Sequence, residues 1–76
     1  MTITRRRLVE QVIDHLRQQI ATGTYPIGSR LPPEPQLMAQ IGVGRSTVRE
    51  AIRALAHEGL LEVRQGDGTY VRALAT

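Results

Sequence analysis

The segment "GVG" at residues 42–44 joins two stretches of helical periodicity and limits how those stretches can pack. The stretch before it predicts a short helix that begins at Pro35, because proline suits a first helical position and disfavours the α region at the residue before it. We expect that helix to end at Gly42 in a left-handed conformation. The stretch after it predicts a helix over about residues 45–58, ended by Gly59. So short a connection makes the two helices cross steeply, and the N-terminal turn of the later helix then points outward.

The rest of the chain predicts one earlier helix and one hairpin. Apolar residues at steps of one, three and four indicate a helix over about residues 5–22: Leu8, Val9, Val12, Ile13, Leu16 and Ile20. Gly23 ends it, and the glycine- and proline-rich segment that follows allows one short strand over residues 28–31. Two alternating runs, "LLEVRQ" and "TYVRAL", flank "GDG" and predict a β-hairpin. The expected fold class is mainly α with a small antiparallel β-hairpin.

Several classes of protein are disfavoured by composition. The chain has no cysteine and no lysine, which excludes disulfides, thiolate nucleophiles, Schiff bases and P-loops. His15 and His57 are far apart, so we expect no metal site and no cofactor. Ser46, His57 and Asp67 could be written as a catalytic triad, but their spacing matches no known arrangement of one. We therefore expect no enzyme. No apolar run approaches the roughly 18 residues of a membrane span, which favours a cytoplasmic protein.

Every one of the ten basic residues is arginine, and the formal net charge is +3. Arginine offers a planar fork that suits phosphates and guanine edges, but the bias is equally explained by coding composition. Arg5, Arg6 and Arg7 begin the first predicted helix, where positive charge opposes the helix dipole and favours a bound anion. The alternative for these three residues is a solvated terminus.

The third predicted helix has an apolar face and a basic face. Val48, Ala51, Ile52 and Leu55 fall in one arc, and Ser46, Arg49 and Arg53 fall in another. At the outward N-terminal turn, backbone N–H groups favour a phosphate, and Arg45 and Arg49 reach toward base edges. Two simpler interpretations remain open. Thr47 and Glu50 fit a capping box, and the arginines fit a solvated face with ion pairs at helical spacing.

Residues 28–71, "GSRLPPEPQLMAQIGVGRSTVREAIRALAHEGLLEVRQGDGTYV", resemble the N-terminal winged-helix domain of GntR-type bacterial transcription regulators. The pattern of that family is approximately L-P-S-E-R-x-L-A, G-V-S-R-T-T-V-R-E-A-L and E-G-L-x-x-x-x-G-x-G-T-x-V. The resemblance implies a winged helix-turn-helix that binds operator DNA as a dimer, with a separate C-terminal effector-binding and oligomerisation domain. We therefore expect residues 1–76 to be a single DNA-binding domain without that second domain, and the fragment to be a monomer.

The resemblance also implies a set of DNA-binding positions. The helix over about residues 45–58 enters the major groove and the wing over about residues 61–72 enters the minor groove. The candidate residues are Arg45, Ser46, Thr47, Arg49, Arg53, Gln65, Gly66 and Arg7. Two positions depart from the family pattern: Pro35 replaces a common DNA-contacting arginine, and Gly44 replaces a common serine or threonine cap. The alternative function is a winged helix that contacts protein or RNA.

Overall fold

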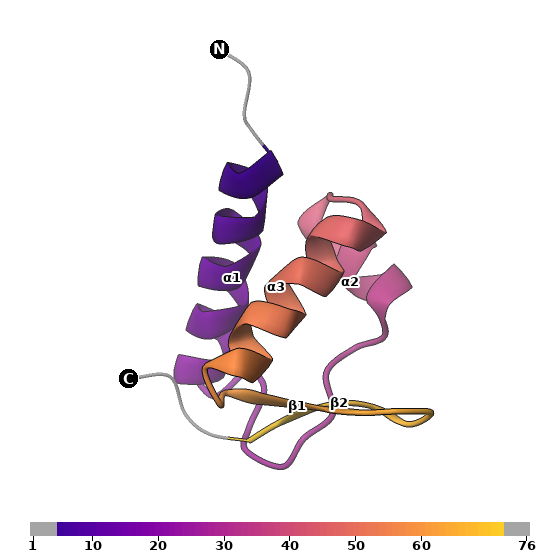
Figure 1. Ribbon diagram of the computed structural model, residues 1–76. Coiled ribbons are helices and arrows are strands. Elements are labelled where there is room, and N and C mark those ends of the chain that lie inside the picture. The colour runs from indigo at the N-terminus through magenta and orange to yellow at the C-terminus, as the bar shows by residue number, and fades with distance from the viewer. Residues whose placement is uncertain (1–4, 73–76) are drawn as a thin grey trace.

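The computed structural model describes residues 5–72, which form three helices and a two-stranded antiparallel hairpin (Figure 1). The elements are α1 (Arg5–Ala21), α2 (Glu34–Ile41), α3 (Arg45–His57), β1 (Leu61–Arg64) and β2 (Gly68–Val71). The predicted order and fold class are confirmed. Figure 1 shows α1 and α3 packed side by side, with the hairpin crossing near the C-terminal end of α3.

The core is formed by the apolar faces that periodicity predicted. α1 contributes Val12, Leu16 and Ile20, each buried, and α3 contributes its whole predicted apolar arc. The other buried apolar side chains are Leu31, Leu37, Leu60, Leu61 and Val71. The opposite face of α3 is exposed because the helix has only one apolar stripe to bury.

The turn between α2 and α3 follows the prediction. Gly42 has a φ of 82°, in the left-handed region that glycine enters without a Cβ clash, and its N–H donates to the carbonyl of Met38 at 2.8 Å. Gly44 has extended backbone and is the N-cap of α3. The chain changes direction between α2 and α3 within these few residues, and the first turn of α3 is therefore exposed.

α2 begins at Glu34, one residue before the predicted start at Pro35. Pro33 is the N-cap, and its carbonyl accepts the N–H groups of Gln36 and Leu37, both at 3.0 Å. Pro35 occupies the second helical position, where a missing N–H leaves no helical hydrogen bond unmade. The helix can therefore include Glu34 although a proline follows it.

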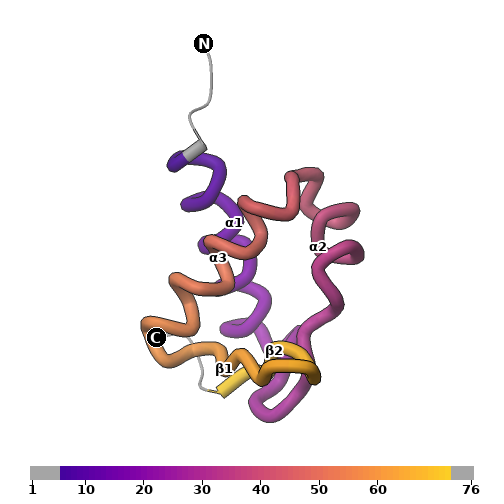
Figure 2. The backbone as a smooth tube through the Cα atoms, turned by 45° about the vertical axis from the view of Figure 1, so that its right-hand side comes forward, coloured from indigo at the N-terminus to yellow at the C-terminus, as the bar shows by residue number. Residues whose placement is uncertain are grey.

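The hairpin has shorter strands than the alternating runs suggested. β1 and β2 pair from Leu61 with Val71 to Arg64 with Gly68, so the turn consists of residues 65–67 and Gly68 belongs to β2. The short strand expected over residues 28–31 is present only as an isolated bridge between Arg30 and Tyr70. Figure 2 shows the connection between α1 and α2 running beside the hairpin at that point.

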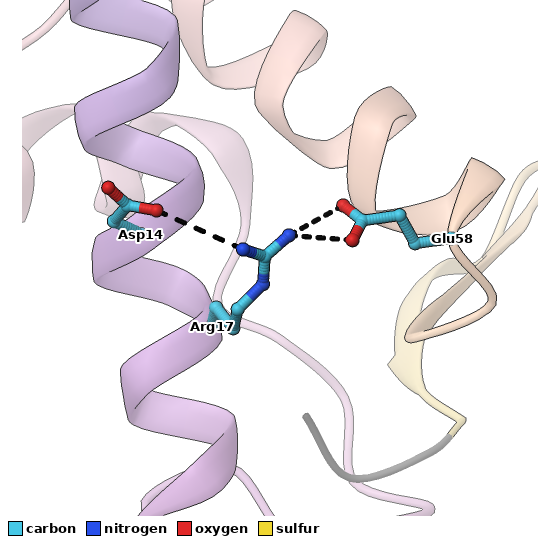
Figure 3. A network of polar contacts seen from close by, with 3 residues as sticks. All are labelled: Asp14, Arg17 and Glu58. Carbon is cyan, nitrogen blue, oxygen red and sulfur yellow. Dashed lines mark hydrogen bonds and ion pairs between the residues drawn. The ribbon is translucent and has the colours of Figure 1, made fainter. Parts of the chain in front are cut away.

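A charged contact joins α1 to the C-terminal end of α3 (Figure 3). Nη2 of Arg17 donates to both carboxylate oxygens of Glu58, at 2.6 and 2.7 Å, and Nη1 lies 4.0 Å from Asp14. Glu58 is the C-cap of α3, so this contact fixes the end of α3 farthest from its exposed first turn.

Candidate nucleic-acid interface

Two arginines stand exposed in the first two turns of α3. The side chains of Arg45 and Arg49 are 60% and 57% exposed, respectively. The N-cap Gly44 has no side chain, and no side-chain cap closes the helix start. The first backbone N–H groups of α3 thus add to the positive charge of these arginines, and this end of the helix is suited to an anionic partner.

The two hydroxyl residues at the helix start have different environments. Ser46 is exposed, whereas Thr47 is only 6% exposed. The prediction that Thr47 and Glu50 form a capping box is wrong. α3 already begins at Arg45, so Thr47 is a helical residue and not the N-cap. The predicted DNA contact of Ser46 is compatible with its position, while the burial of Thr47 leaves little of it for a partner.

A carboxylate that was not predicted as part of the site lies against both arginines. Nε of Arg49 donates to Glu34 at 2.9 and 3.2 Å, and Nε of Arg45 lies 3.9 Å from the same carboxylate. The ion pair proposed for Arg49 at helical spacing is therefore wrong, since its partner is 15 residues away at the start of α2. Glu34 stands at the glutamate of the family pattern quoted above, but helical periodicity does not predict its contact with α3. The absence of any acid in the first turn of α3 is a second sequence signal, because it leaves the arginines there without a local carboxylate.

The wing, residues 61–71, has its turn at Gln65, Gly66 and Asp67, and the first two of these are the predicted tip residues. Both are exposed, and Gly66 has a φ of 76°. The guanidinium of Arg30 donates to the carbonyl of Asp67 and lies over Gly68, where an added Cβ would come 2.5 Å from its Nε. Arg30 therefore holds the wing, and a larger residue at position 68 would displace its guanidinium.

Polar contacts also connect the two strands of the wing. The hydroxyl of Tyr70 donates to Asp67 at 2.9 Å, and this hydrogen bond raises the pKa of Tyr70 above its ordinary value of 10.0. The guanidinium of Arg64 stacks 4.2 Å from the centre of the Tyr70 ring, and its hydrogen bond to Glu62 raises the pKa of Arg64. The turn is thus restrained from both strands.

A groove lies between the wing and the start of α2. It has a volume of about 380 Å³ and runs from Glu34 past Ile52 to the wing tip at Gln65 and Gly66. In Figure 1 the first turns of α2 and α3 and the wing tip lie on the same side of the molecule. Helix and wing therefore border one concave surface, as two elements that contact neighbouring grooves of a duplex would need to.

The remaining predicted residues lie at the edges of this surface. Arg53 is exposed, lines a smaller hollow of about 200 Å³ with Arg49 and Val63, and makes no ion pair with any residue between 5 and 72. Arg7 is exposed in the first turn of α1.

Within the described part of the chain, no three His, Asp or Glu side chains gather as metal ligands would. None of the helices in that part is long and apolar enough to cross a membrane.

Comparisons with known proteins agree on one family. A family model described as "Bacterial regulatory proteins, gntR family" matches residues 8–71. The HTH-type transcriptional regulator Mce2R of Mycobacterium tuberculosis is 46% identical over 70 residues, which are 92% of this chain and 29% of that protein. The chain thus spans less than a third of the length of this relative.

Solved structures of regulatory proteins are also similar to this chain in sequence and in fold. The GntR protein of Streptococcus agalactiae is 51% identical with a TM-score of 0.77, over 86% of this chain and 31% of that chain. AraR(DBD), solved in complex with operator ORR3, is 39% identical with a TM-score of 0.80, over 84% of this chain and 77% of that chain.

Proposed function

Because the chain belongs to the gntR family of bacterial regulatory proteins, we propose that it is the operator-reading module of a ligand-responsive transcription regulator. In this proposal α3 enters the major groove and the wing enters the adjacent minor groove. The main support is that Arg45 and Arg49 are exposed at the start of α3 while the apolar face of the same helix is buried. The similarity to AraR(DBD), which is solved with operators, supports the same class of partner.

The residues divide into base readers and phosphate contacts. Arg45 and Arg49 contact base edges, with guanine the base that suits an arginine fork. Ser46 and the free N–H groups of the first turn of α3 contact a phosphate. Arg53 contacts the same strand farther along the helix, and Arg7 contacts a phosphate from the start of α1.

The wing tip contributes a minor-groove contact. Gln65 offers an amide that donates and accepts hydrogen bonds, and Gly66 lets the backbone approach the groove floor. Its restraint by Arg30 and Tyr70 supports this role, because a wing that is already ordered loses less entropy on binding. Thr47, which is buried within the first turn of α3, acts indirectly by holding that turn against the core.

The whole regulator has further parts in this proposal. An effector-binding and dimerising domain accompanies the winged helix, since the chain matches only 29% of a relative such as Mce2R. The regulator acts on DNA in the cytoplasm, and the winged helix itself needs no cofactor and catalyses no reaction. The 76-residue chain alone binds one half-site as a monomer, because linkage of two modules supplies much of the effective concentration of a dimer. A tight dimer of this chain in sedimentation experiments would contradict this part.

Selection from a pool of random DNA duplexes tests the function. The chain is expected to enrich a short consensus and to bind the selected duplex more tightly than a scrambled duplex of equal length at the same salt concentration. A duplex RNA of the selected sequence should bind no better than scrambled DNA, because α3 cannot enter the narrow major groove of an A-form helix. Enrichment of no sequence, or a preference for the RNA, would overturn operator reading.

A further inference from the structure

Glu34 lies against both of the arginines that the proposed function assigns to base reading. Its carboxylate accepts two hydrogen bonds from Nε of Arg49 and lies 3.9 Å from Nε of Arg45. Its side chain is about half as exposed as those of the arginines. Pro33 and Pro35 flank it, and each proline ring restricts its own φ. The backbone that carries Glu34 is therefore restricted on both sides of this residue.

The atom that Glu34 engages decides what Arg49 can still bind. Within residues 5–72, the hydrogen bonds of the Arg49 side chain run from Nε alone. Its two terminal nitrogens remain available, and these form the end of the fork that donates in parallel to two acceptors such as O6 and N7 of guanine. A carboxylate on Nε thus restrains the plane of the guanidinium without occupying its reading end.

The charge of Glu34 has a second effect. Arg45 and Arg49 are one helical turn apart at the positive end of α3, where like charges repel each other and oppose the helix dipole. The two arginines together carry a charge of +2, and the shared carboxylate reduces the net charge of this group to +1. The attraction of this helix end for any phosphate is thereby lowered, while the hydrogen bonds to Arg49 still orient its guanidinium.

We propose that Glu34 is a positioning residue that aims Arg49 at base edges, and that it raises sequence specificity by lowering non-specific affinity. This inference rests on the proposed function, because specificity has meaning only if the chain reads a sequence. The carboxylate acts through the arginines and makes no direct contact with a base.

The test compares Glu34→Gln with the parent chain on two probes, the duplex selected from the random pool and a scrambled duplex of equal length. Glutamine keeps the size of the side chain and removes its charge. Affinity for the scrambled duplex should rise and affinity for the selected duplex should fall, so that their ratio drops about tenfold, the low end of what one bidentate arginine–guanine pair supplies. A folding defect would lower both affinities together and would also lower the urea unfolding midpoint. Equal ratios in a variant whose unfolding midpoint matches that of the parent would overturn the inference.

Two further variants separate the explanations. Glu58→Gln removes the same charge and also breaks an arginine–carboxylate pair, but at the far end of α3, and it should leave the ratio unchanged. In an Arg49→Ala background, Glu34→Gln should change the ratio less than in the parent, because only the effect of the charge remains. An equal effect with and without Arg49 would mean that Glu34 contacts DNA itself, and the positioning role would be wrong. A parent chain that selects no sequence would instead refute the proposed function.

Discussion

Arg45 and Arg49 are about equally exposed but are held with different firmness. Arg49 is hydrogen-bonded to Glu34 at 2.9 Å, whereas Arg45 approaches the same carboxylate only to 3.9 Å, beyond hydrogen-bond reach. A side chain that is already oriented loses less conformational freedom when it binds. Arg49 is therefore preorganised for its partner, and Arg45 must still be ordered.

Loss of either arginine should weaken recognition of the selected duplex. Arg45→Ala and Arg49→Ala should each cost about 1 to 3 kcal/mol of binding free energy and relax the preference for one base, if each reads a guanine. Fluorescence anisotropy with duplexes that vary at single positions measures both effects. Arg72→Ala removes the same charge from the end of the wing opposite its tip and is the matched control. Unchanged affinity in both α3 variants would remove the base-reading assignment.

Tyr70 should report on the integrity of the wing through its pKa. The hydrogen bond to Asp67 stabilises the neutral phenol, so the pKa of Tyr70 is raised in the folded protein. The stabilisation is fully present below the ordinary pKa of 10.0 and is lost as the pH rises through the raised value. Ultraviolet titration of a Tyr25→Phe chain isolates the Tyr70 phenol. Asp67→Asn should lower the midpoint, and an identical midpoint would show that the hydrogen bond is absent in solution.

At the scale of elements, the wing is stabilised less by its own two strands than by contacts around them. A two-stranded hairpin is marginal alone. Here Leu61 and Val71 anchor it in the core, and the connection before α2 pairs with its outer edge through Leu31, whose N–H donates to Thr69 at 2.8 Å. Arg30, in the same connection, donates a hydrogen bond to the carbonyl of Asp67 in the turn of the wing. The wing is therefore expected to unfold together with the helices.

Gly66 should be sensitive to substitution because of its backbone rather than its surroundings. A Cβ at this position would meet no atom within 4 Å, but the φ of 76° lies in the left-handed region. Gly66→Ala should thus cost about 1 to 2 kcal/mol of unfolding free energy, measured by urea denaturation. Gly66→Asn is the matched control, since asparagine tolerates this conformation and should cost less. Equal losses in the two variants would mean that strain at φ is not the cause.

For the molecule as a whole, the ion pair of Arg17 with Glu58 joins the first helix to the end of the third. Both side chains remain partly exposed, at 37% and 44%, so solvent screens the pair. A double-mutant cycle with Arg17→Ala and Glu58→Ala should give a coupling of about 0.2 to 1 kcal/mol that weakens with added salt. The more exposed pair of Arg6 and Glu10, at 3.9 Å, is the control and should show no measurable coupling. A coupling that added salt does not change would contradict screening by solvent.

Much of the fold follows from local pattern. The apolar spacing of α1 and α3 predicts which faces are buried, because burial of one stripe is the main stabilising contribution available to a helix in a small domain. Gly42 and Gly59 end α2 and α3 as predicted, because the end of a helix depends on the backbone conformation of a few neighbouring residues. The exposed position of Arg45 and Arg49 follows from the same periodicity.

The sequence by itself thus determined the helices, the hairpin and the basic edge of α3, because each depends on residues within about one turn or one strand of each other. Only the tertiary structure decided which carboxylate meets the arginines, since Glu34 and Arg49 are 15 residues apart and meet through the crossing of α2 and α3. It likewise decided that Arg30 holds Asp67 across 37 residues. Long charged side chains choose partners by distance in space, and that distance is set by packing rather than by periodicity.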